Sequence, residues 1–136
     1  MAGLVTGRGQ LRGTKDGPNY SAAHIADTRA ALRRRGLPEV LVVDASHGNS
    51  QKNHLRQLDV VHDLAGQIGA GEQAIRGVML ESHLVAGRQD LDQRHPDALE
   101  YGKSVTDACV DLDMTAAMLD ELARAARARR AGTGPN

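Results

Sequence analysis

The sequence predicts an α/β fold with parallel strands, because short apolar runs alternate with longer segments of helical periodicity. Two predicted strands, 40–43 and 75–80, contain the apolar runs 40–43 and 78–80, and each strand follows a segment whose apolar residues recur every three or four positions. Polar residues follow both runs directly, as expected for buried parallel strands. Right-handed crossovers then put the helices outside the sheet. Three or four such strands fit either a small open sheet or part of a (β/α) barrel.

The composition limits the class of protein. The 136 residues are enough for one domain, and 17 basic residues balance 17 acidic ones, which gives no support to nucleic-acid binding. The apolar runs are too short to span a bilayer, and residues 1–9 lack the apolar core of a signal peptide. We therefore expect no membrane association and a cytoplasmic location. The single cysteine, Cys109, excludes an intrachain disulfide and fits a reducing compartment.

The first elements follow from local signals. Glycines interrupt residues 4–11, so we expect only a degraded first strand within 1–13. Met1 directly before this segment is typical of a natural start, although a cut piece of a longer chain would read the same way. A helix is predicted over 21–35, ended by Gly36 and Pro38, and a strand over 40–43.

The later elements are predicted in the same way. Asn49 or Ser50 would cap a helix that ends at Gly69–Gly71, and a strand follows over 75–80. The apolar face of that helix is predicted to hold Leu55, Leu58, Val61, Leu64, Ala65 and Ile68.

The polar stretch 82–103 is long for a connection and is a candidate functional loop. Residues 104–110 are predicted as a third short strand, followed by a helix from Met114 to Arg130 with Asp113 as its cap. We expect residues 131–136 to form a flexible tail.

Three successive predicted strands end in potential metal ligands: His47 after the first, Glu81 after the second, and Asp107 in or after the third. Because parallel strands end at one edge, these side chains are expected to converge. Any one of them alone would more often satisfy a loop backbone, but their shared placement favours a site. One imidazole and two carboxylates suit divalent manganese, iron, cobalt or zinc and leave positions open for a substrate oxygen.

Four long stretches of the chain resemble signature motifs of type I 3-deoxy-D-arabino-heptulosonate 7-phosphate (DAHP) synthase. They run in the same order as in that family, over residues 11–130, and read LRGTKDGPNYSAAHI, DASHGNSQKNHLRQLDV, GVMLESHLVAGRQ and YGKSVTDAC. The resemblance implies a (β/α)8 TIM barrel and a metal-dependent condensation of phosphoenolpyruvate with erythrose 4-phosphate, at the entry to aromatic amino acid biosynthesis.

The resemblance also implies roles for particular residues. His47, Glu81 and Asp107 match three of the family's four metal ligands, and Arg12 matches an arginine that binds phosphoenolpyruvate. The fourth ligand is a cysteine from an earlier strand, and the family's other phosphate-binding cations also precede the region matched here. The cysteine of the TDAC motif, Cys109, is expected in the core, yet it is the first candidate to replace the missing ligand.

Two further residues of the resembling motifs receive weaker roles. His83, from the ESHL motif, is expected to fix the loop by hydrogen bonds behind the ligands. Lys15 is a candidate to meet a substrate phosphate, although exposed lysines are usually solvated.

The resemblance to the C-terminal half of this family implies that residues 1–136 form one half-barrel domain. Such a domain would leave strand edges and an apolar inner face uncovered. A two-fold homodimer or a separate N-terminal half chain would complete it, and in a homodimer the partner's first strand would bring an arginine to the ligands. Three functions stay open: a DAHP synthase-type enzyme on phosphorylated substrates, a metal-dependent lyase or aldolase-like enzyme on another carbonyl substrate, and a non-catalytic interaction module.

Overall fold

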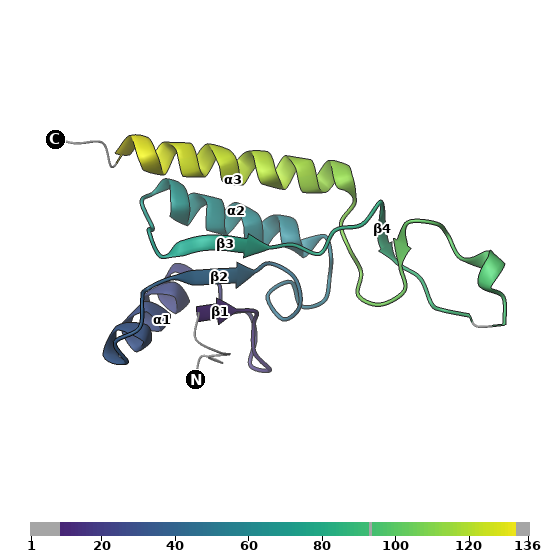
Figure 1. Cartoon of the computed structure of the whole chain (residues 1–136), viewed down its shortest axis with the longest axis horizontal. Coiled ribbons are helices and arrows are strands. Elements are labelled where there is room, and N and C mark those ends of the chain that lie inside the picture. The colour runs from purple at the N-terminus through teal and green to yellow at the C-terminus, as the bar shows by residue number, and fades with distance from the viewer. Residues whose placement is uncertain (1–8, 93, 133–136) are drawn as a thin grey trace.

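A computed structural model describes residues 9–92 and 94–132 of the chain, and it contains a parallel sheet of three strands (Figure 1). The strands β1 (Gly9–Leu11), β2 (Leu41–Asp44) and β3 (Ile75–Met79) lie in the order β1-β2-β3, and both pairs are parallel. Helix α1 (Ala22–Arg34) connects the first pair, and α2 (Arg56–Gly69) connects the second. The predicted α/β class with parallel strands is therefore confirmed.

The core lies between the helices and one face of the sheet. Leu41 and Val43 are fully buried in it, together with residues of α1 and α2. Side chains alternate along a strand, and Val42, between those two, is only partly buried and does not belong to the core. Met79, which ends β3 beside Asp44 of β2, is likewise partly exposed and outside the core. The second face of the sheet is thus less covered by the described residues than the first.

The start of α2 differs from the prediction. Neither Asn49 nor Ser50 caps it, because residues 47–55 form consecutive turns and the helix begins only at Arg56. The residue before it, Leu55, makes no side-chain cap and is 53% exposed, so it does not belong to the buried face. Three non-glycine residues in the turns, His47, Gln51 and Lys52, have positive φ angles. These unusual backbone angles stop the helix from extending back to Asn49.

The last helix, α3 (Leu112–Gly132), lies along α2 (Figure 1). Its first turn is capped by Asp111 rather than by Asp113, since the Asp111 Oδ1 accepts a hydrogen bond of 2.8 Å from the Met114 N–H. The helix continues through Gly132, two residues into the predicted tail. Residues 133–136 of that tail, and residues 1–8 of the predicted first strand, lie outside the described residues.

The predicted third strand over 104–110 is wrong. Residues 103–104 form the short strand β5 (Lys103–Ser104), which pairs with β4 (Val85–Arg88) in a separate parallel sheet projecting from the body (Figure 1). The polar stretch also contains a single helical turn, η1 (Pro96–Ala98). At its two ends, near the main sheet, the stretch 82–110 closes on itself through a parallel bridge between Ser82 and Val110. Among the described residues, no helix is long and apolar enough to cross a membrane.

Candidate metal centre

The imidazole of His47 and the carboxylates of Glu81 and Asp107 meet at the carboxyl end of the parallel sheet. One ligand atom from each lies within 4.8 Å of the other two. The Nε2 atom of His47 is 3.4 Å from Oε1 of Glu81 and 3.7 Å from Oδ2 of Asp107. The structure thus brings together the three residues that the sequence singled out, although the predicted third strand does not form.

His47 is held from behind by Asp44, the last residue of β2. The Nδ1 atom of His47 lies 2.8 Å from Oδ2 of Asp44, whose side chain is completely buried. Burial raises the pKa of the Asp44 carboxyl, and the hydrogen bond from the Ser46 N–H and the nearby His47 act to lower it. An ionised Asp44 accepts the Nδ1–H of His47, which leaves the lone pair of Nε2 directed at the two acidic side chains.

The backbone of His47 is also unusual. Its φ angle of 42° lies in the left-handed region, which residues other than glycine seldom adopt. The strain persists because the surrounding hydrogen bonds hold the turn: the His47 carbonyl accepts from the Lys52 N–H at 2.9 Å. Strained backbone of this kind concentrates at functional sites, and here it occurs at the residue whose imidazole contacts Asp44, Glu81 and Asp107.

Glu81 lies two residues beyond β3 and is fixed at both its backbone and its side chain. Its Oε2 accepts a hydrogen bond of 2.6 Å from the Ser46 hydroxyl, so Oε1 is the oxygen that faces His47. Its N–H donates to Oε1 of Gln57 and its carbonyl accepts from Nε2 of the same side chain, at 2.9 and 3.2 Å. The Val110 N–H donates to the same carbonyl at 3.0 Å.

Asp107 is the most exposed of the three candidate ligands His47, Glu81 and Asp107, which we call the trio. Its side chain is 53% exposed, against 24% for His47 and 23% for Glu81. The thiol of Cys109, two residues further on, is not part of the ligand group; it contacts the Asp107 carbonyl oxygen at 3.5 Å. Burial, followed by the charge of Glu81, raises the pKa of this thiol. Within the described residues, Cys109 lies outside the group of three candidate ligands.

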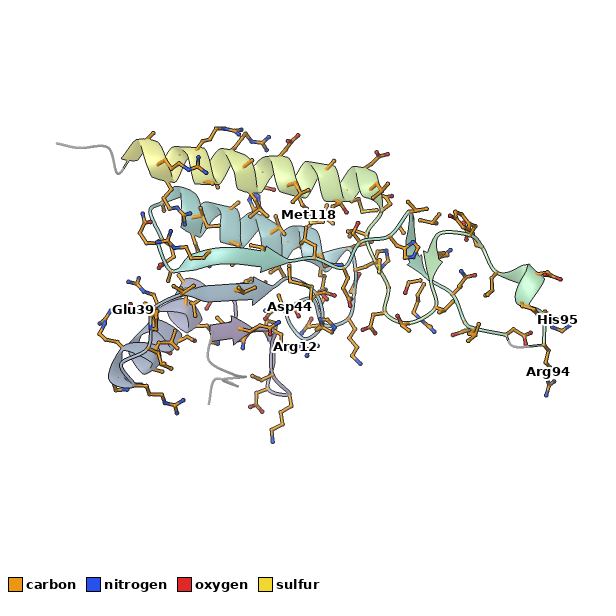
Figure 2. The ribbon with its side chains drawn as sticks, viewed as in Figure 1. Arg12, Glu39, Asp44, Arg94, His95 and Met118 are labelled. Atoms are coloured by element: carbon orange, nitrogen blue, oxygen red, sulfur yellow. The ribbon has the colours of Figure 1, made fainter. Side chains whose placement is uncertain are left out.

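Arg12 of the same chain lies beside Asp44, the carboxylate that contacts His47. Its Nε atom is 3.8 Å from Oδ2 of Asp44, and Figure 2 shows the two side chains next to each other at the ends of β1 and β2. The Gly48 N–H donates to the Arg12 carbonyl at 3.1 Å, which ties the loop after β1 to the turn that carries His47. Within a single chain, Arg12 thus lies next to the residue that contacts His47. Half of its side chain is exposed and open to an anion.

The two remaining candidate site residues are Lys15 and His83, and neither belongs to the trio. Lys15 is exposed in the tight turn between Thr14 and Gly17. His83 is also exposed; its Nδ1 accepts a hydrogen bond of 2.9 Å from the Leu84 N–H, and its own N–H donates to Val110. The expected loop-fixing role of His83 and the expected phosphate contact of Lys15 stay predictions.

The donor set fits a divalent metal. Ligand atoms about 2.1 Å from one ion lie roughly 3 to 3.5 Å apart; the Nε2–Oε1 separation of 3.4 Å falls within that range, and the separation of 3.7 Å between Nε2 and Oδ2 of Asp107 is slightly longer. One neutral imidazole and two carboxylates compensate the charge of a divalent cation, and the exposure of Asp107 leaves room for further ligands. The donor types do not select among manganese, iron, cobalt and zinc.

Sequence reasoning missed the side chains behind the ligands. Asp44 ends a strand and gave no signal beyond its polarity, whereas Gln57 is a polar residue on the buried stripe of α2 that contains Val61, Leu64 and Ile68. The sequence did offer one signal for Gln57: a polar side chain at a position of the helix where the neighbouring buried positions are apolar. Asn49, expected to cap α2, instead donates to the carbonyls of Leu11 and Asp44 at 3.2 and 2.8 Å and joins β1 to the site.

The sequence was compared with models of known protein families. The model of the DAHP synthetase I family matches residues 3–120, which is most of the sequence. The chain belongs to the DAHP synthetase I family. This membership confirms the resemblance carried by the four sequence motifs.

Individual members of the DAHP synthetase I family are similar to this chain in sequence and in structure. A tyrosine-inhibited phospho-2-dehydro-3-deoxyheptonate aldolase of Schizosaccharomyces pombe is 53% identical over 122 residues, and a Phe-sensitive one of Escherichia coli is 51% identical over 120 residues. Both alignments cover 88% of this chain and 33% of the relative. The solved structure of phospho-2-dehydro-3-deoxyheptonate aldolase from Francisella tularensis has a TM-score of 0.84 and 45% identity, and the match covers 89% of this chain and 34% of that one. The chain thus spans about a third of the length of these relatives.

Proposed function

We propose that this chain provides the metal-binding part of a cytoplasmic DAHP synthase, which condenses phosphoenolpyruvate with erythrose 4-phosphate. The observation that carries the proposal is the meeting of His47 Nε2, Glu81 and Asp107 at one end of the sheet, in a chain of the DAHP synthetase I family. The similar proteins of Schizosaccharomyces pombe, Escherichia coli and Corynebacterium glutamicum are phospho-2-dehydro-3-deoxyheptonate aldolases, so a lyase on another substrate and a non-catalytic module are not favoured.

The residues take distinct parts in this proposal. His47, Glu81 and Asp107 would hold a divalent ion, with manganese, iron, cobalt and zinc as candidates. The chemistry that such an ion supplies is polarisation of a carbonyl oxygen. Asp44 keeps the Nδ1 proton of His47 in place, so that Nε2 presents its lone pair. The exposed guanidinium of Arg12 would bind the anionic groups of phosphoenolpyruvate at the edge of the trio, and Lys15 is a more distant candidate for phosphate.

We further propose that the chain acts as half of a (β/α)8 barrel completed by more polypeptide. Two features support this assembly: β1 and β3 are edge strands of the described sheet, and Val42 and Met79 lie outside the core on its less covered face. The completing part would be either a second copy of the chain or a separate N-terminal half chain. The second solution would restore the cysteine ligand and the phosphate-binding cations that the resemblance places earlier in the family.

The experiment that tests the activity compares the chain alone with the chain co-expressed with the N-terminal part of the fission yeast relative. Each preparation is incubated with manganese and both phosphorylated substrates, and consumption of phosphoenolpyruvate is followed with product formation. We expect product in at least one preparation, its loss with Glu81→Ala, and no loss with His62→Ala, whose exposed imidazole pairs with Glu121 on the helices. Absence of product in both preparations would contradict the proposed activity.

A further inference from the structure

We propose that Gln57 is a positioning residue that holds Glu81 in the orientation needed for metal binding. The inference rests on the proposed metal site and adds a residue that touches neither metal nor substrate. It is carried by one juxtaposition: a completely buried glutamine side chain at the start of α2 makes two hydrogen bonds to the backbone of a single residue, the ligand Glu81.

The side-chain amide of Gln57 continues the sheet where its strands have already separated. The Ala45 N–H donates to the Met79 carbonyl at 2.9 Å, and beyond this bond the chain after β2 turns away toward His47. Glu81 therefore has no strand partner on that side. The Gln57 Oε1 accepts from its N–H and Nε2 donates to its carbonyl, as a peptide group of a neighbouring strand would do.

The surroundings of Gln57 give no other reason for a glutamine. On α2, Val60, Val61 and Leu64 are buried to the same degree and are apolar. Burying an amide is unfavourable unless both its donor and its acceptor are bonded, and a methionine would fill a similar volume without that requirement. What the glutamine adds is a fixed position for the backbone of Glu81.

Fixing the backbone also fixes which carboxylate oxygen is available. The Ser46 hydroxyl holds Oε2 at 2.6 Å while the Gln57 amide holds the peptide groups on both sides of the Cα atom. Oε1 is then the oxygen left to face Nε2 of His47, at 3.4 Å. Without Gln57 the Glu81 N–H loses this acceptor, and its carbonyl keeps the hydrogen bond from the Val110 N–H. The backbone of Glu81 is then held less firmly, and the carboxylate would spend less time beside the imidazole.

The test measures the manganese dissociation constant of the purified chain at a temperature where circular dichroism shows each variant to be folded. Gln57→Met removes both hydrogen bonds at nearly constant volume. The matched control is Gln67→Met, on the same helix, which also removes two hydrogen bonds, to the Tyr20 carbonyl at 2.9 Å and to Oδ1 of Asp63 at 2.6 Å, neither of them to a candidate ligand. We expect the dissociation constant to rise about 10-fold or more for Gln57→Met, as for other groups that orient ligands, and to stay unchanged for Gln67→Met.

A second variant covers the case in which Gln57→Met does not fold. Gln57→Asn keeps the amide but is one methylene shorter, so it cannot reach both backbone groups, and we expect the same direction of change. Equal dissociation constants for the wild type and the folded Gln57 variants would overturn the inference while leaving the metal site intact. A wild-type chain that binds no manganese would overturn the proposed function and this inference with it.

Discussion

At the scale of single residues, the buried carboxylate of Asp44 serves two neighbours at once. It accepts from His47 Nδ1 at 2.8 Å and lies 3.8 Å from the guanidinium of Arg12, so one group links the proposed metal ligand to the proposed anion-binding residue. A buried carboxylate is tolerated when it is hydrogen-bonded, and the Ser46 N–H supplies a further donor at 2.8 Å. Asp44 therefore holds the imidazole of His47 from outside the group of three candidate ligands.

Asp44→Asn is expected to weaken manganese binding about 10-fold or more, because a neutral amide holds the Nδ1 tautomer of His47 less firmly. The dissociation constant is measured by calorimetric titration. Asp92→Asn is the control, since the exposed Asp92 pairs with His95 at the same spacing and at 2.9 Å. Equal losses of affinity in the two variants would show that the effect is not specific to the site.

At the scale of elements, ion pairs fasten the end of α1 to the segment before β2. Arg33 and Arg29 both donate to the carboxylate of Glu39, at 2.7 to 2.9 Å, and Arg29 also reaches Glu72. The hydrogen bonds from Arg33 and Arg29 lower the pKa of Glu39 from 4.5 to about 2. Because the folded pKa is below the unfolded one, the stabilisation is present above pH 4.5 and is lost as the pH falls toward 2.

Glu39→Gln should therefore lower the melting temperature at pH 7. It should lower it less at pH 3, where the wild-type carboxylate is partly protonated and its ion pairs with Arg33 and Arg29 stabilise the fold less. Thermal melts followed by circular dichroism at both pH values measure this difference. The effect should be small, since the pair is exposed to solvent and screened by salt. A difference that stays constant from pH 7 to pH 3 would argue against the ion pairs as its cause.

The loop after β1 and the turn after β2 touch through two glycines. Gly13 has a φ angle of 81°, and a Cβ atom there would lie 2.5 Å from the carbonyl carbon of Gly48. Gly13→Ala should lower the free energy of unfolding by about 1–3 kcal/mol, through strain and overpacking. Gly66→Ala, in open space on α2, should instead raise it by about 0.5–1 kcal/mol. Chemical denaturation measures both, and equal effects of the two variants would contradict the close contact.

The sequence predicts the regular elements well and the irregular ones poorly. Helices α1, α2 and α3 follow from apolar spacing, and the ligands His47 and Glu81 follow from their places after strands. The turns over 47–55 had no signal, because non-glycine residues such as Gln51 adopt left-handed angles there. The strand predicted over 104–110 does not form, because the backbone of this segment pairs with the projecting β4 and with residues beyond β3. These are contacts between segments distant in sequence, which local composition does not predict.

At the scale of the whole molecule, the sheet has two edge strands and a less covered face in the described residues. If two copies meet through that face, the mass in solution should exceed that of one 14.5 kDa chain. Val42→Glu, which puts a charge on the face, should return it to the mass of one chain. Leu119→Glu, on an exposed position of α3, should not. Light scattering after size exclusion measures these masses, and a monomeric wild type would leave the separate N-terminal half chain as the completing partner.

The central claim is that His47, Glu81 and Asp107 together bind a divalent metal. The most direct measurement is the manganese content of the purified chain after equilibration with the ion, determined together with protein concentration. We predict one ion bound per chain, its loss in His47→Ala, and no change in His62→Ala. A wild-type chain without bound manganese, or a His47→Ala variant that retains it, would contradict the claim.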